Sequence, residues 1–155
     1  MNSERAAVEL ELTVQKAVNS PGLPTKAELR RWLTAALEQS AAITLRFVGT
    51  AEGRRLNCAY RRKDYATNVL SFAYGGDGRS AALSGDLVLC APVLRREARE
   101  QGKTLNAHVA HLTVHGALHL QGHDHQRPRP AARMEALEVK ILSKLGYPDP
   151  YALKA

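Results

Sequence analysis

Cysteine is scarce in this chain, and long apolar runs are missing. Cys58 and Cys90 are the two cysteines among 155 residues. They are too few for a disulfide framework or a cysteine-based zinc site, so we expect a reducing compartment, the cytoplasm. No apolar run reaches the roughly 18–20 residues of a membrane helix, which predicts a protein with no membrane span. Residues 1–5 contain no apolar stretch typical of a signal peptide, so no secretory leader is expected.

Acidic residues are outnumbered by basic ones. The chain has 22 Lys and Arg against 15 Asp and Glu, a formal net charge of +7 that leaves six histidines uncounted. Such an excess favours a polyanionic partner such as nucleic acid, although charge also serves solubility alone. Hydrophobic residues make up 45% of the chain, an ordinary share for a globular protein. The length suits a single domain spanning 1–155.

Hydrophobic periodicity predicts a small mixed α/β sheet with helices packed against it, and no internal repeat or second domain. Strands are expected at 8–14, 43–47, 68–72 and 86–90. The last of these is apolar almost throughout, which is typical of a strand buried on both faces. Helices are expected at 26–37, 51–61, 92–101, 104–121 and 131–145. Thr25 and Glu28 suit a capping box, and Pro128 and Pro130 are expected to break the chain before the last helix.

The six histidines all lie between positions 108 and 125. Four follow one another at spacings of three, four and four, which places them in one stripe on a helix face: His108, His111, His115 and His119. His111 and His119, the outer two of the last three, are roughly 12 Å apart along the axis. That is too far to share one metal ion bonded at about 2.0–2.1 Å, whereas adjacent pairs can share one.

Residues 115–125 have the spacing H-x-x-x-H-x-x-G-x-x-H, which is the zinc-binding frame of metzincin proteases. We infer a metal centre, Zn²⁺ or another divalent ion, on His115, His119 and His125, with an open position for water. Gly116 stands where those proteases need a glutamate base, so peptide hydrolysis is disfavoured. His123 competes with His125 for the third position.

The neighbouring groups have less specific roles. His108 and His111 are interpreted as groups behind the ligands or facing substrate, with a purely structural role as the alternative. Asp124 is a candidate for orienting a ligand, and either it or His111 for assisting proton transfer. No residue stands out as the general base.

A basic run, Arg61-Arg62-Lys63, joins an expected helix to an expected strand. A guanidinium held at the end of such an element can clamp a phosphate with two hydrogen bonds. Together with a metal centre, this predicts a phosphodiester hydrolase whose positive charge steers a polyanionic substrate.

The sequence resembles the bacterial YbeY family over about residues 43–151. The resemblance rests on 115–125 and on four further blocks in family order: 56–64 with 67–72, 85–89, 134–138, and 145–151. It implies a small α/β domain with a mostly four-stranded sheet, about five or six helices, and a metal cleft at the end of the histidine-bearing helix.

The family resemblance also implies an activity. It implies a zinc-dependent endoribonuclease specific for single strands, acting in maturation of the 3′ end of 16S rRNA and in ribosome quality control. Site residues carried over are His115, His119 and His125 as metal ligands and Arg61 as a catalytic residue. Arg62 and Lys63 join Arg61 in binding RNA. The small ribosomal subunit with its proteins, and a ribosome-assembly GTPase, are the implied partners.

The chain departs from the family pattern at several places. His123 replaces a usual Tyr, Ala66 and Asn68 replace Pro and Asp, and 126–130 are basic and proline-rich instead of acidic. None of these changes a proposed ligand. Two alternatives stay open: an RNA-binding ribosome-assembly factor whose metal is structural, and a metal-dependent hydrolase of a smaller substrate.

Overall fold

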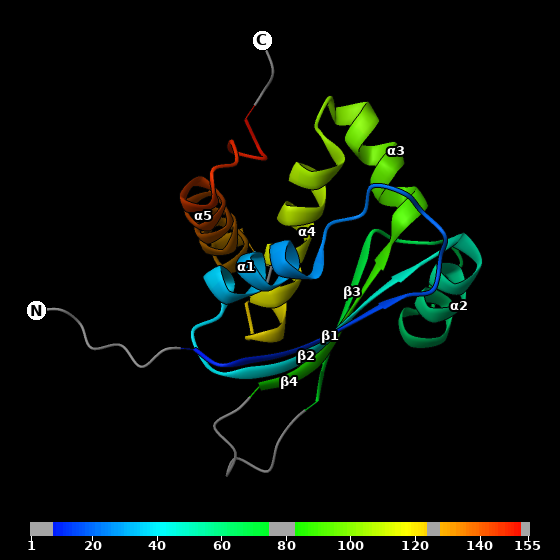
Figure 1. Ribbon diagram of the computed structural model, residues 1–155, viewed down its shortest axis with the longest axis horizontal. Coiled ribbons are helices and arrows are strands. Elements are labelled where there is room, and N and C mark those ends of the chain that lie inside the picture. The colour runs from blue at the N-terminus through cyan, green and yellow to red at the C-terminus, as the bar shows by residue number, and fades with distance from the viewer. Residues whose placement is uncertain (1–7, 75–82, 124–127, 153–155) are drawn as a thin grey trace, which may run out of the picture.

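The computed structural model describes residues 8–74, 83–123 and 128–152. Within these ranges a four-stranded sheet carries five helices (Figure 1). The elements are β1 (Leu10–Lys16), α1 (Lys26–Ala36), β2 (Ala41–Val48), α2 (Thr50–Arg61), β3 (Val69–Tyr74), β4 (Leu83–Cys90), α3 (Ala91–Gln101), α4 (Leu105–Leu120) and α5 (Pro128–Leu145). None of these helices has the length and apolar composition needed to cross a membrane.

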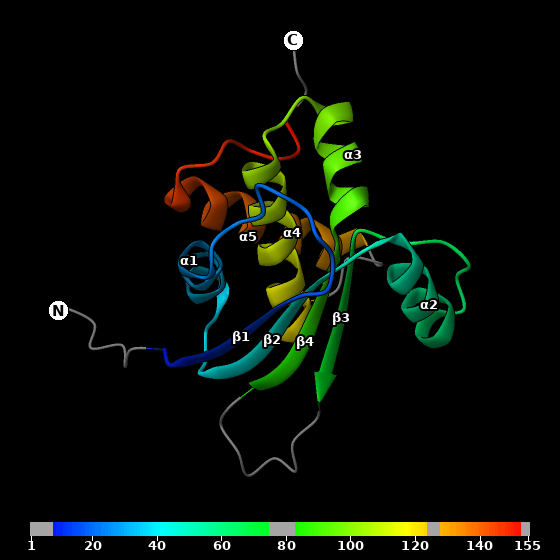
Figure 2. The same ribbon diagram turned by 45° about the vertical axis from the view of Figure 1, so that its right-hand side comes forward.

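The strand order is β1-β2-β4-β3. The pairs β1–β2 and β2–β4 are parallel, and β3 runs antiparallel to β4. The sheet is therefore mixed and four-stranded, as expected from the sequence. Because β3 pairs only with β4 among the described strands, it forms one edge of the sheet, beside α2 (Figure 2).

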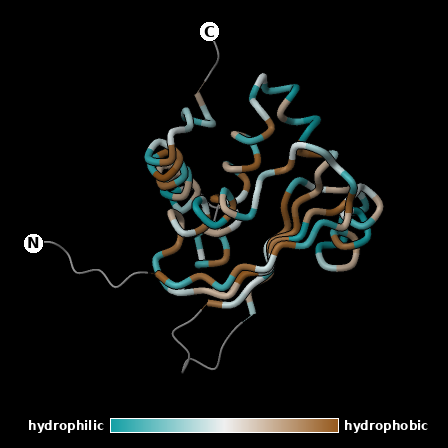
Figure 3. The backbone as a smooth tube through the Cα atoms, in the orientation of Figure 1, coloured by the Kyte–Doolittle hydropathy of each residue, from teal (hydrophilic) through white to brown (hydrophobic). Residues whose placement is uncertain are grey.

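Both faces of the sheet are covered. Alternate residues of β2, among them Ile43 and Phe47, pack with α1, α4 and α5 into the main core. On the other face, Val88 and Cys90 of β4 pack with Leu56 of α2 in a smaller cluster. Figure 1 shows α1, α4 and α5 on one side of the sheet and α2 on the other, and the strands between them are largely hydrophobic in Figure 3. The prediction that the strand at 86–90 is buried on both faces is confirmed for residues 87–90.

The first helix begins as its sequence predicts. The Glu28 N–H donates to Thr25 Oγ1 at 3.1 Å, and the Thr25 N–H donates to Glu28 Oε1 at 2.9 Å, so the capping box is complete. Burial of Trp32 in the main core, at 0% exposure, anchors the helix on the sheet.

The start of α5 differs from the sequence expectation. Pro128 and Pro130 lie inside the first turn of the helix and do not break the chain before it. The physical reason is that the first-turn N–H groups have no partner within the helix, so a residue without an N–H loses nothing there. Proline also has the helical φ angle already fixed.

Candidate active site

Helix α4 lies at the centre of the molecule and exposes almost nothing except histidines. Between 108 and 120, His111, His115 and His119 are partly exposed and every other residue is buried. The Thr104 side chain caps the helix by accepting the Ala107 N–H at 3.0 Å. The rest of the helix is enclosed by the sheet, α1, α3 and α5. Three of the four histidines in the predicted stripe are thus accessible along this part of α4, and the fourth, His108, is buried.

Neighbouring rings along the stripe are in edge-to-face contact. The ring centroids of His111 and His115 are 6.3 Å apart, and those of His115 and His119 are 5.6 Å apart. The pair selected from the sequence as two ligands of one ion therefore lies closest together. Gly122 then ends the helical path with a positive φ of 95°, a left-handed conformation that favours glycine. His123 follows, partly buried, and its N–H donates to the carbonyl of Leu118 at 3.1 Å.

Two residues named from the sequence, Asp124 and His125, lie outside the described residues. The third metal position, and the choice between His123 and His125, are therefore still predictions. Among the described residues, no group of three or more histidine, cysteine, aspartate or glutamate side chains is placed to hold a metal ion.

Gly116 explains why the site lacks the protease base. A Cβ atom at this position would lie 2.7 Å from Leu87 Cδ2 and 3.3 Å from Ser71 Oγ. A side chain on the residue after His115 would therefore press against Leu87 and Ser71 of the sheet, which leaves little room for a glutamate.

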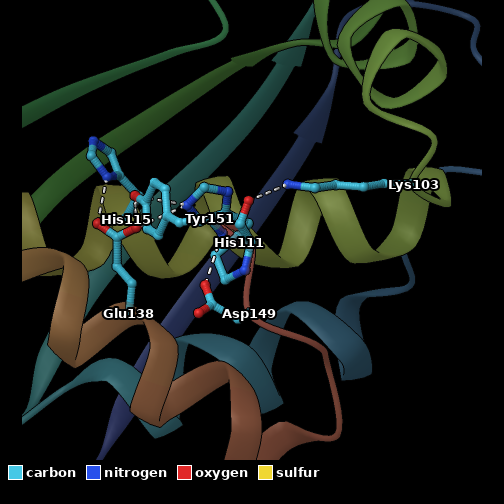
Figure 4. Close-up of polar contacts among 7 residues, drawn as sticks. Lys103, His111, His115, Glu138, Asp149 and Tyr151 are labelled. Atoms are coloured by element: carbon cyan, nitrogen blue, oxygen red, sulfur yellow. Dashed lines mark hydrogen bonds and ion pairs between the residues drawn. The ribbon is translucent and has the colours of Figure 1, made fainter. Parts of the chain in front are cut away.

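Glu138 of α5 holds two of the histidines. Its Oε2 accepts a hydrogen bond from His115 Nδ1 at 2.8 Å, and its Oε1 contacts His111 Nε2 at 2.8 Å and the Tyr151 hydroxyl at 2.5 Å (Figure 4). Burial by itself would raise the pKa of Glu138, but the hydrogen bonds from His111, His115 and Tyr151 outweigh it and lower the pKa to about 2. The side chain is thus a buried carboxylate with three donors.

The same contacts act on its partners. Burial lowers the pKa of His111, although Glu138 opposes this effect, so His111 is a neutral imidazole near pH 7. Burial and the hydrogen bond to Glu138 both raise the pKa of Tyr151, so its hydroxyl stays protonated and donates.

His108 has a structural contact. It is 2% exposed, and its Nε2 lies 2.9 Å from Glu97 Oε1, which ties α4 to α3. The hydrogen bond to His108 lowers the pKa of Glu97. A second hydrogen bond, from Asn68 just before β3, lowers it further. Of the two interpretations drawn from the sequence, this geometry favours the structural one.

A polar cleft of about 200 Å³ lies along the outer edge of β3. It brings together His115 and His119 of α4 with Arg61 at the end of α2. Its other walls are Asn57, Lys63, Tyr65, Thr67, Asn68, Val69 and Ser71. His111 does not line this cleft, since it lies on the Glu138 side of α4, where a separate cavity of about 480 Å³ is bordered by Glu97, His108, His111, His115 and Tyr151. A larger cavity of about 600 Å³ touches the stripe only at His111.

The three residues of the basic run 61–63 do not all face the cleft. Arg61 and Lys63 both line the cleft, whereas Arg62 is the cap of α2, has a φ of 58°, and is absent from the cleft wall. Within the described part of the chain, no ion pair involves Arg61 or Lys63. Arg54, by contrast, is held by Asp64 at 2.7 Å. Its guanidinium lowers the pKa of that carboxyl.

Two asparagines stabilise the loop between α2 and β3, which carries Lys63. Asn57, buried at 2% exposure, donates from Nδ2 to the Tyr65 carbonyl at 2.7 Å. At the other end of the loop, Asn68 Oδ1 accepts the Val69 N–H at 2.7 Å. The Tyr65 side chain remains 56% exposed beside the cleft.

Glu138 and Tyr151 were not identified as site residues by sequence reasoning. One signal was available for Glu138: it stands midway between Met134 and Leu142, four residues from each, and all three are buried at no more than 1% exposure. A glutamate at the centre of an apolar helix stripe needs a partner, because such residues are almost never fully buried unpaired. Tyr151 carries no comparable signal.

Fold and cleft together define a small α/β protein with a histidine and arginine site at the exposed edge of its sheet. The chain belongs to the YbeY family: the family model described as Endoribonuclease YbeY matches residues 13–146.

Curated relatives agree with this assignment. A protein of Aromatoleum aromaticum named Endoribonuclease YbeY is 58% identical over 154 residues, which cover 97% of this chain and 98% of the relative. One of the same name from Thiobacillus denitrificans is 54% identical and covers 94% of this chain and 98% of its own. Among solved structures, the solution structure of TM1509 from Thermotoga maritima matches with a TM-score of 0.53 at 20% identity, covering 87% of this chain and 91% of that one. This last likeness supports the fold alone.

Proposed function

We propose that this protein is a metal-dependent endoribonuclease that cuts single-stranded RNA, with Zn²⁺ or another divalent ion held by His115, His119 and His125. The observation that carries the proposal is the cleft, which places two adjacent imidazoles opposite Arg61 and Lys63. Relatives named Endoribonuclease YbeY that align over nearly the whole chain support the same activity.

The donor set fits a zinc-type ion. Imidazole nitrogens suit Zn²⁺, and the rings of His115 and His119 are in contact. Because His115 donates from Nδ1 to Glu138, its Nε2 is the nitrogen available to a metal. His125 is proposed as the third ligand because of its spacing after Gly122 in the sequence. A bound ion would supply Lewis acidity toward a phosphoryl oxygen.

The protein's own cations bind and orient the phosphate. Arg61 offers a planar fork of donors that matches two phosphate oxygens, and Lys63 adds a second positive charge from the same wall. Charge that develops on the phosphate during cleavage is stabilised best by donors already in place. The hydrogen bond from Asn57 to the Tyr65 carbonyl ties the loop that carries Lys63 to α2, the helix that ends at Arg61.

A preference for single strands follows from the kinds of side chain that line the cleft. Tyr65 combines with the two cations in one wall, which is the combination of aromatic and positive side chains that binds unpaired nucleotides. A duplex keeps its bases stacked inside and does not offer one to such a ring.

We extend the proposal to the setting implied by family membership. The substrate is precursor rRNA, cut near the 3′ end of 16S rRNA, and the enzyme also removes defective ribosomes in quality control. The small subunit with its proteins and a ribosome-assembly GTPase are the partners, in the cytoplasm.

The matched pair Arg61→Ala and Arg62→Ala tests the role of the cleft, because the two residues carry the same charge and only Arg61 lines the wall. Zinc-quantified protein is assayed on a labelled RNA with single- and double-stranded segments. We expect Arg61→Ala to lose about 10²–10³-fold in the cleavage rate constant, in the range seen for removal of a transition-state donor, and Arg62→Ala to change it little. Equal losses would contradict the assignment.

The third ligand is tested separately by replacing His123 and His125 with alanine and measuring zinc per chain. Loss of zinc only in His125→Ala supports the proposal, and loss only in His123→Ala refutes that assignment. Protein that binds zinc and RNA but never cuts would instead be an assembly factor with a structural metal.

A further inference from the structure

Behind the histidines lie two residues from the C-terminal part of the chain, Glu138 and Tyr151. Glu138 has no exposed side-chain surface, yet both of its oxygens are engaged. One oxygen holds His115, and the other meets His111 and Tyr151. Removing a donor from a buried carboxylate leaves polar atoms unsatisfied, so this group is rigid only while all three contacts exist.

The contact with His115 sets which ring nitrogen carries the proton. Glu138 is an acceptor at this position, so His115 Nδ1 supplies the hydrogen of this bond and Nε2 is the nitrogen left to face a metal. A carboxylate behind an imidazole both orients the ring and makes it a more basic ligand.

Three contacts bring the Tyr151 hydroxyl to Glu138. The Tyr151 N–H donates to Asp149 Oδ1 at 2.8 Å, Lys103 Nζ donates to the Pro150 carbonyl at 3.3 Å, and the Tyr151 ring lies edge-to-face on His111 with centroids 5.3 Å apart. The segment 149–151 therefore runs from α5 back to the turn before α4 (Figure 4). It borders the side of the histidine stripe that faces away from the cleft.

We propose that Glu138 is a positioning residue for the metal ligand His115, and that Tyr151 locks Glu138 in place, so that the C-terminal segment 149–151 tunes metal affinity. The inference rests on the proposed metal site at His115. It goes further because it assigns Glu138 and the segment 149–151 a role in holding the metal ligand His115.

Two isosteric substitutions test this, each with a matched control. Glu138→Gln is compared with Glu135→Gln, an exposed glutamate one turn away on α5. Tyr151→Phe is compared with Tyr147→Phe, a tyrosine of the same chain end whose ring packs on Trp32. Zinc affinity of the intact chain is measured by competition with a chromogenic chelator. Long-range ¹H–¹⁵N spectra of the zinc-free protein report the His115 tautomer.

We expect zinc affinity to fall about 10–100-fold in Glu138→Gln and about 10-fold in Tyr151→Phe, as is typical when a group behind a metal ligand is lost. The controls should match the wild type. The His115 ring should be protonated at Nδ1 in the wild type and populate both tautomers in Glu138→Gln. If Glu138→Gln does not fold, Tyr151→Phe and the tautomer measurement decide the question.

Wild-type zinc affinity and an unchanged tautomer in both variants would overturn the inference while leaving the proposed metal site intact. An equal loss in the controls would also overturn it. If the wild type binds zinc no better than His115→Ala, the metal site itself is wrong, and that result is distinguishable from both of the others.

Discussion

Gly85→Ala should destabilise the protein by crowding the place where α4 approaches the sheet. A Cβ atom at this position would lie 2.7 Å from Leu120 Cδ2 and 2.9 Å from the Phe72 carbonyl oxygen. The leucine end can shift, but the oxygen belongs to the backbone of β3, which is tied to β4 by the sheet. To relieve these contacts, the strand or the helix must move by several tenths of an ångström within a close-packed interior.

The expected cost follows from these two contacts. Overpacking a core typically destabilises by about 1–3 kcal/mol, and a contact with fixed backbone places Gly85→Ala near the middle, at about 2 kcal/mol. For a chain of this length, that corresponds to a fall in Tm of roughly 4–8 °C. Since Leu120 follows His119 directly, the shift also reaches the cleft, and we expect the cleavage rate per folded molecule to fall about 10-fold.

The assay is urea unfolding followed by circular dichroism, with cleavage measured on the folded fraction. Ser84→Ala is the matched control, because Ser84 is the exposed neighbour on the same strand and its loss should change stability by less than about 0.5 kcal/mol. A Gly85→Ala protein as stable as the wild type, or more stable, would refute the close approach of α4 to β4.

Three further predictions concern separate parts of the molecule. Tyr65→Ala should weaken binding of a single-stranded oligonucleotide about 10-fold by fluorescence anisotropy, while Tyr65→Phe keeps affinity because stacking needs only the ring; equal losses in both would contradict stacking. The lowered pKa of Glu97 means that its hydrogen bonds with His108 and Asn68 stabilise the fold at pH values above the ordinary pKa near 4.5, and this stability is lost as the pH falls through the lower folded pKa. Glu97→Gln should therefore flatten the acid side of the stability profile measured by urea unfolding, and an unchanged slope would contradict the pairing with His108. Arg54→Ala should leave the free energy of unfolding within about 0.5 kcal/mol of the wild type, because the pair with Asp64 is exposed; a larger change would contradict that.

Local patterns predicted most of the secondary structure because they record which face of each element is buried. The capping box at Thr25 and the glycine after α3, with φ of 65°, marked helix ends through chemistry confined to a few residues. The proline start of α5 was placed wrongly because proline signals both a break and a first turn, and only the partner elements decide between them. The strand order, with β4 inserted between β2 and β3, depends on long-range pairing that has no local signature.

The candidate site divides in the same way. The histidine stripe was predictable because four histidines follow one helix period, and the structure brings the His115 and His119 rings into contact. Arg61 and Lys63 were predictable as a basic run, but their separation from Arg62 was not, since it depends on a left-handed residue at the end of α2. Glu138 and Tyr151 reach His111 from 27 and 40 residues away, and only folding shows that they meet.

The activity that we propose for this protein is internal cleavage of RNA, which depends on a metal ion held by the histidines. The most direct measurement uses a circular single-stranded RNA, which has no ends for an exonuclease, with wild type and His119→Ala whose zinc content has been quantified. We expect the wild type to open the circle, to lose this activity on chelation and to regain it when zinc or another divalent ion is returned, and we expect His119→Ala to bind the circle without opening it. Cleavage by chelated protein or by His119→Ala at the wild-type rate would contradict the claim, as would a zinc-loaded wild type that binds the circle and leaves it closed.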